Sequence, residues 1–259
     1  MHYKKRELAN ARRRLEQQLL RMGWAKHECP YPQTEEVSFV NGYNTPHINQ
    51  TTFWFENCLK RLNQGSEAYY ALEMRSFDLV HITWRCNYNN PNNHHPLDTL
   101  DAFDYVHEHL INGLPYDYRD GNPKHRGIIR IIDWEHPENN TFEYVKGWRG
   151  ALNDGFAWDF ILCVNAIPLG GILLEANPTV SDEATEIVPC QAALDLAQYQ
   201  LDKDFQIPVY CHSLVISDGE KILAGDPWMD LEDMQEIRTL KEVLRPTDFL
   251  LKQVKSWYK

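Results

Sequence analysis

The chain has 259 residues, 43% of them hydrophobic, and a formal net charge of −11 at pH 7. This composition is typical of a globular protein and excludes a largely disordered chain. No apolar run approaches the about 18 residues of a transmembrane helix, and the polar, basic N-terminus lacks the apolar core of a secretion signal. We therefore expect a cytoplasmic protein without a membrane segment.

The charge is distributed unevenly along the chain. Residues 1–21 carry seven Lys or Arg side chains against two Glu, whereas the remainder is strongly acidic. Since phosphate contacts dominate non-specific affinity for nucleic acid, an acidic body binds DNA poorly on its own. If DNA is the substrate, either the basic segment with Arg12 and Arg13 or a partner must supply much of the attraction. A solvated helix face explains the same basic run equally well.

The first half of the chain is predicted to be mostly helical. Apolar residues at spacings of three and four predict a helix over 3–22, which Gly23 would end. The composition further predicts a loop over 27–50, a helix over 51–63, strand or mixed structure over 68–84, an exposed Asn-rich loop over 87–95, and a helix over 97–110.

From residue 127 the pattern changes to strands. Short β-rich runs predict strands over 127–134, 141–145, 157–164 and 168–174. A helix at about 190–201, a strand over 209–217, a hairpin turn into 221–224 and an amphipathic helix from Leu231 follow. This order predicts an α/β fold with a mixed central sheet flanked by helices. We expect a single domain over 1–259, with a mostly helical part (1–126), a sheet core that holds the candidate site (127–230) and a C-terminal helix (231–259).

The segment 158–177 carries the strongest functional signal. It predicts two apolar strands joined by a tight turn, with Asp159 on the first and Glu175 on the second. An antiparallel hairpin centred on Ile167 places these two acids opposite each other, with Cβ atoms roughly 4.5–5.5 Å apart. Two carboxylates so close repel each other unless a cation lies between them, and hard divalent ions bind such oxygens. Asn177 projects from the same face as Glu175, because strand residues two apart share a face.

Several segments match a known family in collinear order. They are LRMGW (20–24), RLN (61–63), LING (110–113), IIDWEHPENNTFEYV (131–145), DFILCVNAIPLGGILLEAN (159–177), QYQ (198–200) and IPVYCHSLVISDGEKILAG (207–225). Together these segments resemble the N-terminal nuclease domain of the type I restriction enzyme R subunit, which has a PD-(D/E)XK nuclease-like fold. The N-A-I-P-L turn and the V-I-S-D-G segment are the most specific parts of the resemblance.

The resemblance implies Mg²⁺-dependent hydrolysis of phosphodiester bonds in double-stranded DNA. It assigns Asp159 and Glu175 to the metal-binding acids, Asn177 to the place of the family's lysine, and Tyr199 to a DNA-contacting tyrosine on the crossover helix. Glu16 matches more loosely an acid on the first helix. Implied partners are the modification and specificity subunits and a motor domain. No ATP site is expected in this chain, since it has no Walker A sequence.

Three positions depart from the family pattern. Asn177 replaces the lysine, Trp158 replaces the proline before the first acid, and Asp195 replaces a glutamine four residues before Tyr199. Asn177 can donate a hydrogen bond but carries no charge, and Asp195 fits either a third metal ligand or a solvated helix position. Two functions therefore remain open. One is a restriction endonuclease with a degenerate, weak or inactive site, and the other is a non-catalytic nuclease-fold protein for DNA binding or complex assembly.

Overall fold

The computed structural model describes residues 5–27, 46–74, 108–117, 126–149, 157–174, 190–198 (except 192 and 196), 213–217 and 221–255. Within these ranges, seven strands form one sheet in the order β1-β4-β5-β6-β7-β8-β9. The pairs β1–β4 and β6–β7 are parallel, and the other neighbours are antiparallel. The predicted α/β fold with a mixed sheet and flanking helices is confirmed.

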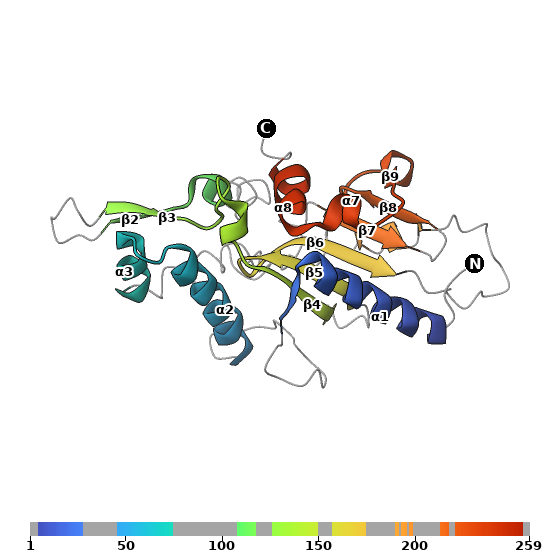
Figure 1. The fold of residues 1–259 in the computed structure, drawn as a ribbon, viewed down its shortest axis with the longest axis horizontal. Helices are drawn as coiled ribbons and strands as arrows, with labels where there is room; N and C mark the ends of the chain where they lie inside the picture. The colour runs from blue at the N-terminus through green and yellow to red at the C-terminus, as the bar shows by residue number, and fades with distance from the viewer. Residues whose placement is uncertain are drawn as a thin grey trace, which may run out of the picture.

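The elements have the following bounds. The strands of the large sheet are β1 (Ala25–Lys26), β4 (Phe142–Arg149), β5 (Ala157–Val164), β6 (Ile167–Leu174), β7 (Ser213–Ser217), β8 (Ile222–Gly225) and β9 (Gln235–Glu236), and a two-stranded sheet pairs β2 (Leu114–Asp117) with β3 (Arg126–Ile129). The helices are α1 (Lys5–Met22), α2 (Pro46–Leu62), α3 (Glu67–Met74), α7 (Lys241–Leu244) and α8 (Pro246–Asp248), with 3-10 turns η2 (Pro137–Asn139) and η4 (Leu231–Asp233) and the π-helical η5 (Phe249–Val254). Figure 1 shows α3, β2 and β3 at one end of the molecule, away from α1 and β7–β9. None of the helices described is long and apolar enough to cross a membrane.

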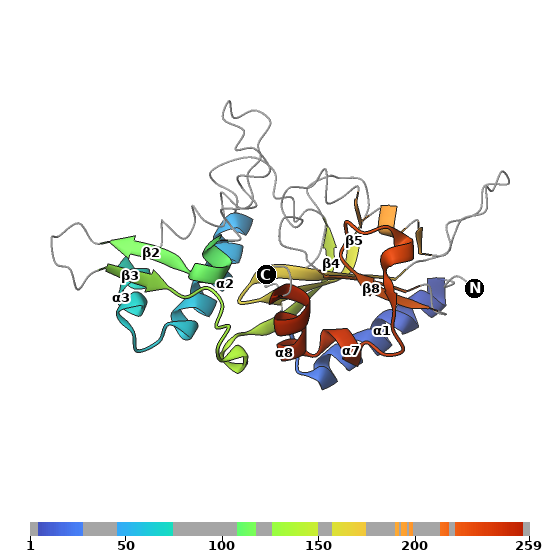
Figure 2. The same ribbon diagram turned by 90° about the horizontal axis from the view of Figure 1, so that it is seen from above.

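Buried side chains cover both faces of the large sheet. Strand residues alternate between faces, so Phe160 and Leu162 of β5 join Ile172 of β6 in a cluster with buried residues of α1 and η5. Ile161 and Leu173 join a second cluster, which includes the helical residues at 190–198. Figure 2 shows α1, α7 and α8 together on one side of the sheet. The apolar character of both strand faces therefore reflects burial on both sides.

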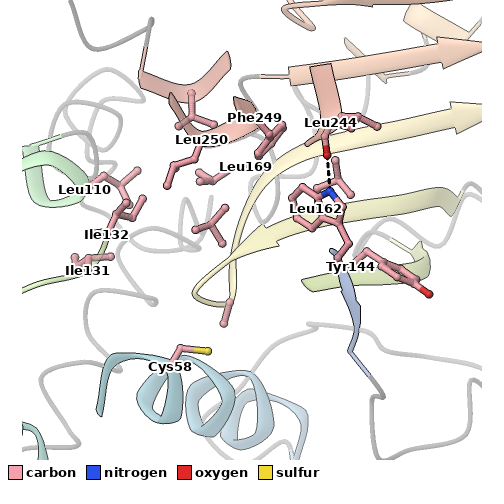
Figure 3. Packing of buried hydrophobic residues seen from close by; sticks show 14 of the residues in the cluster. Cys58, Leu110, Ile131, Ile132, Tyr144, Leu162, Leu169, Leu244, Phe249 and Leu250 are labelled. Carbon is pink, nitrogen blue, oxygen red and sulfur yellow. Dashed lines mark hydrogen bonds between the residues drawn. The ribbon is translucent and has the colours of Figure 1, made fainter. Parts of the chain in front are cut away.

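The end of α1 is tied to the C-terminal part of the chain. Gly23 adopts φ +106°, a left-handed conformation that favours glycine, and ends the helix. Trp24 then enters the core, where its Nε1 donates a 2.7 Å hydrogen bond to the carbonyl oxygen of Leu244. Its ring packs edge-on against Phe142 and Phe249, at centroid distances of 5.7 and 5.4 Å. Figure 3 shows Leu244 and Phe249 within the same hydrophobic cluster.

The predicted bounds of the central strands and of the first helix agree with the structure, while other boundaries are wrong. β5 covers the predicted 157–164, and α1 ends at Met22 as predicted. α2 begins at Pro46, inside the predicted loop, because proline suits the first turn of a helix. Helix α3 occupies the start of the predicted strand or mixed segment, and β3 ends at Ile129, short of the predicted residue 134. The predicted loop over 87–95 and residues 97–107 of the predicted helix lie outside the described residues.

The predicted single helix from Leu231 is wrong. Residues 235–236 pair with β8 as strand β9, and short helical elements follow. Pro246 explains one of the breaks, since the residue before a proline is disfavoured in the helical region and Arg245 is extended (φ −64°, ψ 129°). The C-terminal part is therefore a chain of short elements packed against the sheet.

Candidate functional site

The turn between β5 and β6 is centred between Asn165 and Ala166, earlier along the chain than predicted. Asn165 and Ala166 both have positive φ, 50° and 67°, and Val164 pairs with Ile167 on either side of them. Two left-handed central residues are typical of a type I′ hairpin turn. The predicted centre at Ile167 is therefore wrong.

The observed register differs from the predicted one. A hairpin centred on Ile167 would pair Phe160 with Leu174, whereas Phe160 pairs with Ile172, and the strands shift register once, at Leu162 and Cys163. The predicted register is therefore wrong by two residues at Phe160. Glu175 lies outside the described residues, so its opposition to Asp159 stays a prediction.

Asp159 is buried where α1, β5 and β6 meet. Its side chain is 3% exposed. Oδ2 accepts a 2.7 Å hydrogen bond from the backbone N–H of Leu174, the last residue of β6. Oδ1 accepts a hydrogen bond from Nε of Arg12 on α1, and the two side chains form an ion pair. One carboxylate therefore links the end of β6 to the first helix.

Burial raises the pKa of Asp159 above its usual range. The N–H of Leu174 and the positive charges of Arg12 and Lys146 act in the opposite direction, but they do not offset the desolvation of the carboxylate. The folded chain therefore binds a proton at Asp159 more readily than the unfolded chain does. Any added cation beside Asp159 favours its ionised form.

A second ion pair lies one helical turn further along α1. Oε2 of Glu16 accepts a 2.8 Å hydrogen bond from Nζ of Lys146, and Oε1 accepts one of 3.3 Å from the hydroxyl of Tyr144. Burial acts to raise the pKa of Glu16, but the bonds and the charge from Lys146 and Tyr144 lower it overall. Burial, together with the Glu16 charge, raises the pKa of Tyr144 to about 12. Figure 3 shows the Tyr144 hydroxyl pointing away from the hydrophobic cluster.

We name the α1 charge cluster by its five residues: Arg12, Glu16, Tyr144, Lys146 and Asp159. Arg12 and Glu16 are four residues apart and so share one face of α1, from which they contact β5 and β4. The sequence drew attention to Arg12, Glu16 and Asp159, each for a separate reason, but missed Tyr144 and Lys146. Tyr144 and Lys146 alternate along β4 and so share a face of the strand, but no sequence pattern links them to α1.

The other predicted site residues are only partly described by the structure. Arg13 is exposed on α1. Asp195 is exposed and accepts a 2.7 Å hydrogen bond from Gln191, one turn earlier on its helix. Asn177 and Tyr199 lie outside the described residues. Among the residues described, no group of three or more His, Cys, Asp or Glu side chains is arranged to hold a metal ion. The Mg²⁺ site and the DNA-binding roles stay predictions.

Asn165, from the N-A-I-P-L segment, has a structural role. Its side chain is 1% exposed, and Nδ2 donates hydrogen bonds of 2.7 Å to the Ile131 carbonyl and to Oδ1 of Asn140. Its Oδ1 accepts bonds from both the backbone N–H and the hydroxyl of Thr141. Asn140 also bonds the backbone N–H and carbonyl of Asp133. This network joins the hairpin turn to the bends after β3.

Asn63, from the R-L-N segment, fixes a second junction. Its Oδ1 accepts a bond from the backbone N–H of Arg130, and its Nδ2 donates to the carbonyls of Arg130 and Leu59, all within 2.8–2.9 Å. Trp134 donates from Nε1 to the carbonyl of Leu110, in the L-I-N-G segment, at 2.9 Å. These segments of the resemblance hold the α2 region, the β3 strand and the 131–140 bends together.

Trp158 has a packing role in this chain. Its side chain is 1% exposed, and a Cβ at Gly171 would lie 2.5 Å from its Cζ3 atom. Glycine on β6 therefore makes the room that the indole ring fills. The departure from the family's proline at this position is explained by the core, without a role in chemistry.

A pocket of about 540 Å³ lies around the bends after β3 and shares no residue with the α1 charge cluster. Its lining includes both charge signs, and Arg130 forms a 2.8 Å ion pair with Asp133. Nζ of Lys255 lies 5.9 Å from the ring centre of Trp134. Because Arg130 and Asp133 pair with each other and Lys255 lies over an aromatic ring, the pocket indicates no particular ligand.

A mixed sheet covered by helices, with a buried acid on a central strand, is consistent with a nuclease-like fold. The family model for the N terminus of the type I restriction enzyme R protein matches residues 4–227. The chain belongs to this family, as the sequence predicted, since the match covers most of its length. The family supports a nuclease-like role in restriction–modification. None of the curated proteins matches the chain.

Proposed function

We propose that the chain is the DNA-cleaving domain of a type I restriction R subunit, hydrolysing phosphodiester bonds of double-stranded DNA with Mg²⁺. Asp159 and Glu175 bind the metal ion, and Asn177 contacts the phosphate from the position of the family's lysine. The observation that supports this best is the buried Asp159 carboxylate bonded to the N–H of Leu174. Glu175 follows Leu174 directly in the sequence.

The proposed partners follow from family membership. They are double-stranded DNA, the modification and specificity subunits, and a motor domain, in the cytoplasm. The exposed Arg13 lies on the same helix as the α1 charge cluster, so a basic face of α1 is available to steer DNA toward Asp159. Tyr199 is proposed to contact the DNA from the crossover helix.

The donor set of this centre suits a hard divalent ion. Carboxylate oxygens are preferred ligands of Mg²⁺, and each has two lone pairs. Oδ1 and Oδ2 of Asp159 each accept one bond, from Arg12 and from Leu174, so both keep capacity for a cation. When bound, Mg²⁺ polarises the scissile phosphate and lowers the pKa of an attacking water. The side chain of Arg12 competes with the ion for Asp159.

The rate of cleavage is expected to be low. Asn177 donates a hydrogen bond but brings no positive charge to the phosphate. Losing one preorganised donor in comparable sites costs about 10²–10³ in rate. The proposed enzyme is therefore slow unless another residue supplies the charge.

A second candidate is a non-catalytic nuclease-fold protein for DNA binding or complex assembly. The ion pair between Arg12 and Asp159 favours it, because the guanidinium already neutralises the acid that would bind the metal. In that case the α1 charge cluster only fixes the helix on the sheet. DNA or a partner subunit would then contact exposed basic residues such as Arg13.

Nicking of supercoiled plasmid with Mg²⁺ or Mn²⁺ separates the two candidates. The native chain is compared with Asp159→Asn, Glu175→Gln and Asn177→Lys, and Glu232→Gln serves as the control because Glu232 is an exposed acid outside the cluster. We expect slow nicking by the native chain, faster nicking by Asn177→Lys, and loss in the two acid variants. Calorimetry with Mn²⁺ should show binding that Asp159→Asn removes. No nicking and no metal binding in either the native chain or Asn177→Lys would leave only the non-catalytic candidate.

A further inference from the structure

A positively charged group lies close to Asp159 on the neighbouring strand. Lys146 of β4 pairs with Phe160 of β5, the residue directly after Asp159. Lys146 and Asp159 contact α1 one helical turn apart, through Glu16 and Arg12, and the side chain of Lys146 is 38% exposed whereas that of Asp159 is 3% exposed. The ammonium group is therefore near the buried acid and still accessible to a polyanion.

Glu16 fixes the position of that ammonium group. Its Oε2 holds Nζ of Lys146 at 2.8 Å, while its Oε1 accepts the hydroxyl of Tyr144. Because the Glu16 carboxylate is anchored to β4 by a second bond, Lys146 is held before any ligand arrives, which lowers the entropic cost of a contact. An ammonium has three N–H donors, so a bond to Glu16 is compatible with one to a phosphate oxygen.

Arg12 is less suited to contact a phosphate at this site. Its guanidinium is bound to the buried Asp159, and turning it toward DNA would leave that carboxylate without its ion-pair partner. The partner of Lys146, Glu16, is less deeply buried than Asp159, since its side chain is 20% exposed and that of Asp159 is 3% exposed. A phosphate contact by Lys146 therefore leaves the Arg12–Asp159 pair intact.

We propose that Lys146 is a catalytic residue that contacts the scissile phosphate beside Asp159 and supplies the positive charge missing at Asn177, with Glu16 as its positioning residue. This inference rests on the proposed function. The ammonium donates to a non-bridging phosphate oxygen and opposes the negative charge that develops there during hydrolysis. No covalent bond to Lys146 forms or breaks, and it keeps its proton throughout.

The first test measures plasmid nicking by the full chain with Mn²⁺. Lys221 provides the matched control, since its Nζ also faces a glutamate, Glu236, at 4.0 Å, and it is 59% exposed beside β8. We expect the nicking rate to fall about 10²–10³-fold in Lys146→Gln, to be largely kept in Lys146→Arg, and to be unchanged in Lys221→Gln. Adding Asn177→Lys to Lys146→Gln should restore the rate, because it returns a charge to the same centre.

The second test is independent of cleavage. Binding of a short DNA duplex is measured over a series of salt concentrations with EDTA present. Loss of one phosphate contact makes the plot of log affinity against log salt less steep by about 0.9, so we expect this change in Lys146→Gln and none in Lys221→Gln. The double variant Glu16→Gln/Lys146→Gln replaces the ion pair by two uncharged glutamine side chains that can still hydrogen-bond to each other. Its plot of log affinity against log salt should become less steep by the same amount, while its urea unfolding midpoint should equal that of the native chain.

These readouts separate the inference from the proposed function. If the native chain neither cuts DNA nor binds Mn²⁺, the proposed function fails. The salt dependence of DNA binding by Lys146→Gln is then the only test of the phosphate contact by Lys146. A slope equal to that of the native chain then overturns the inference, and a less steep one supports a phosphate contact. If the native chain cuts DNA, equal nicking rates for Lys146→Gln and Lys221→Gln overturn the inference about Lys146. A native chain that binds no DNA duplex overturns the inference as well.

Discussion

Replacing Arg12 by methionine removes the guanidinium that pairs with the buried Asp159 and keeps much of the side chain's apolar length. Breaking a buried ion pair from one side costs about 3–5 kcal/mol, whereas an exposed pair contributes about 0–1 kcal/mol. This pair lies between the two cases, because the Asp159 side chain is 3% exposed and that of Arg12 is 42% exposed. The N–H of Leu174 and the charge of Lys146 remain. We therefore expect Arg12→Met to lower the free energy of unfolding by about 1–3 kcal/mol at pH 8.

The loss should depend on pH with a definite sign. Burial raises the pKa of Asp159 in the folded chain above its unfolded value, so its contribution to stability is present at low pH and is lost as the pH rises through the folded pKa. Removing Arg12 takes away a group that lowers this pKa and so raises it further. Below about pH 3.9, where unfolded aspartate is also protonated, the two chains have the same Asp159 charge and the difference should be small. It should grow as the pH increases above this value.

Urea unfolding at several values between pH 4 and pH 8, followed by tryptophan fluorescence, measures the effect. Arg13→Met is the matched control, since it removes the same side chain from the adjacent, exposed position of α1. A double-mutant cycle with Asp159→Asn isolates the pairwise term. Equal losses in Arg12→Met and Arg13→Met, or a difference between them that does not change with pH, would refute this reasoning about the ion pair.

Two further predictions concern the hairpin itself. Asn165→Ala should lower the free energy of unfolding by about 3–5 kcal/mol, because it leaves the partly buried N–H of Thr141 and the buried carbonyl of Ile131 without this partner and puts alanine at φ 50°. In urea titrations Asn165→Gly should lose about 1 kcal/mol less, and a loss under 1 kcal/mol for alanine would contradict the assigned network. Gly171→Ala should cost about 1–3 kcal/mol, because the added Cβ would meet Trp158 at 2.5 Å. Trp158→Phe should relieve part of that cost in thermal unfolding, and an additive double variant would argue against the clash.

The sequence predicted the central elements well because their patterns are local. The spacing of apolar residues defined α1, and two apolar runs defined β5 and β6 almost to the residue. The register between these two strands was missed for a physical reason. Both faces of the strands are buried, so the alternation that normally fixes register is absent. The type I′ turn is also made by Asn165-Ala166, without the Asn-Gly pair that usually marks it.

The α1 charge cluster could not be predicted from sequence, because its members are far apart along the chain. Arg12 and Asp159 are separated by 147 positions, and Glu16 and Lys146 by 130. No local pattern joins these residues, and each has an ordinary interpretation as a solvated charge. Only the packing of α1 against β4 and β5 brings the four charges together.

The sequence segments that identify the family indicate the fold more than they indicate the activity. Asn165, the first residue of the N-A-I-P-L segment, uses both its amide N–H groups and its carbonyl oxygen to join the turn to the 131–140 bends. Asn63 bonds the backbone of Arg130 and of Leu59. A chain can therefore contain these segments, and the fold that they stabilise, whether or not it cuts DNA. Activity depends instead on the charge balance at Asp159, where burial, Arg12 and Lys146 act on one carboxylate. If Lys146 supplies the charge that Asn177 lacks, the departure at residue 177 does not by itself imply an inactive site.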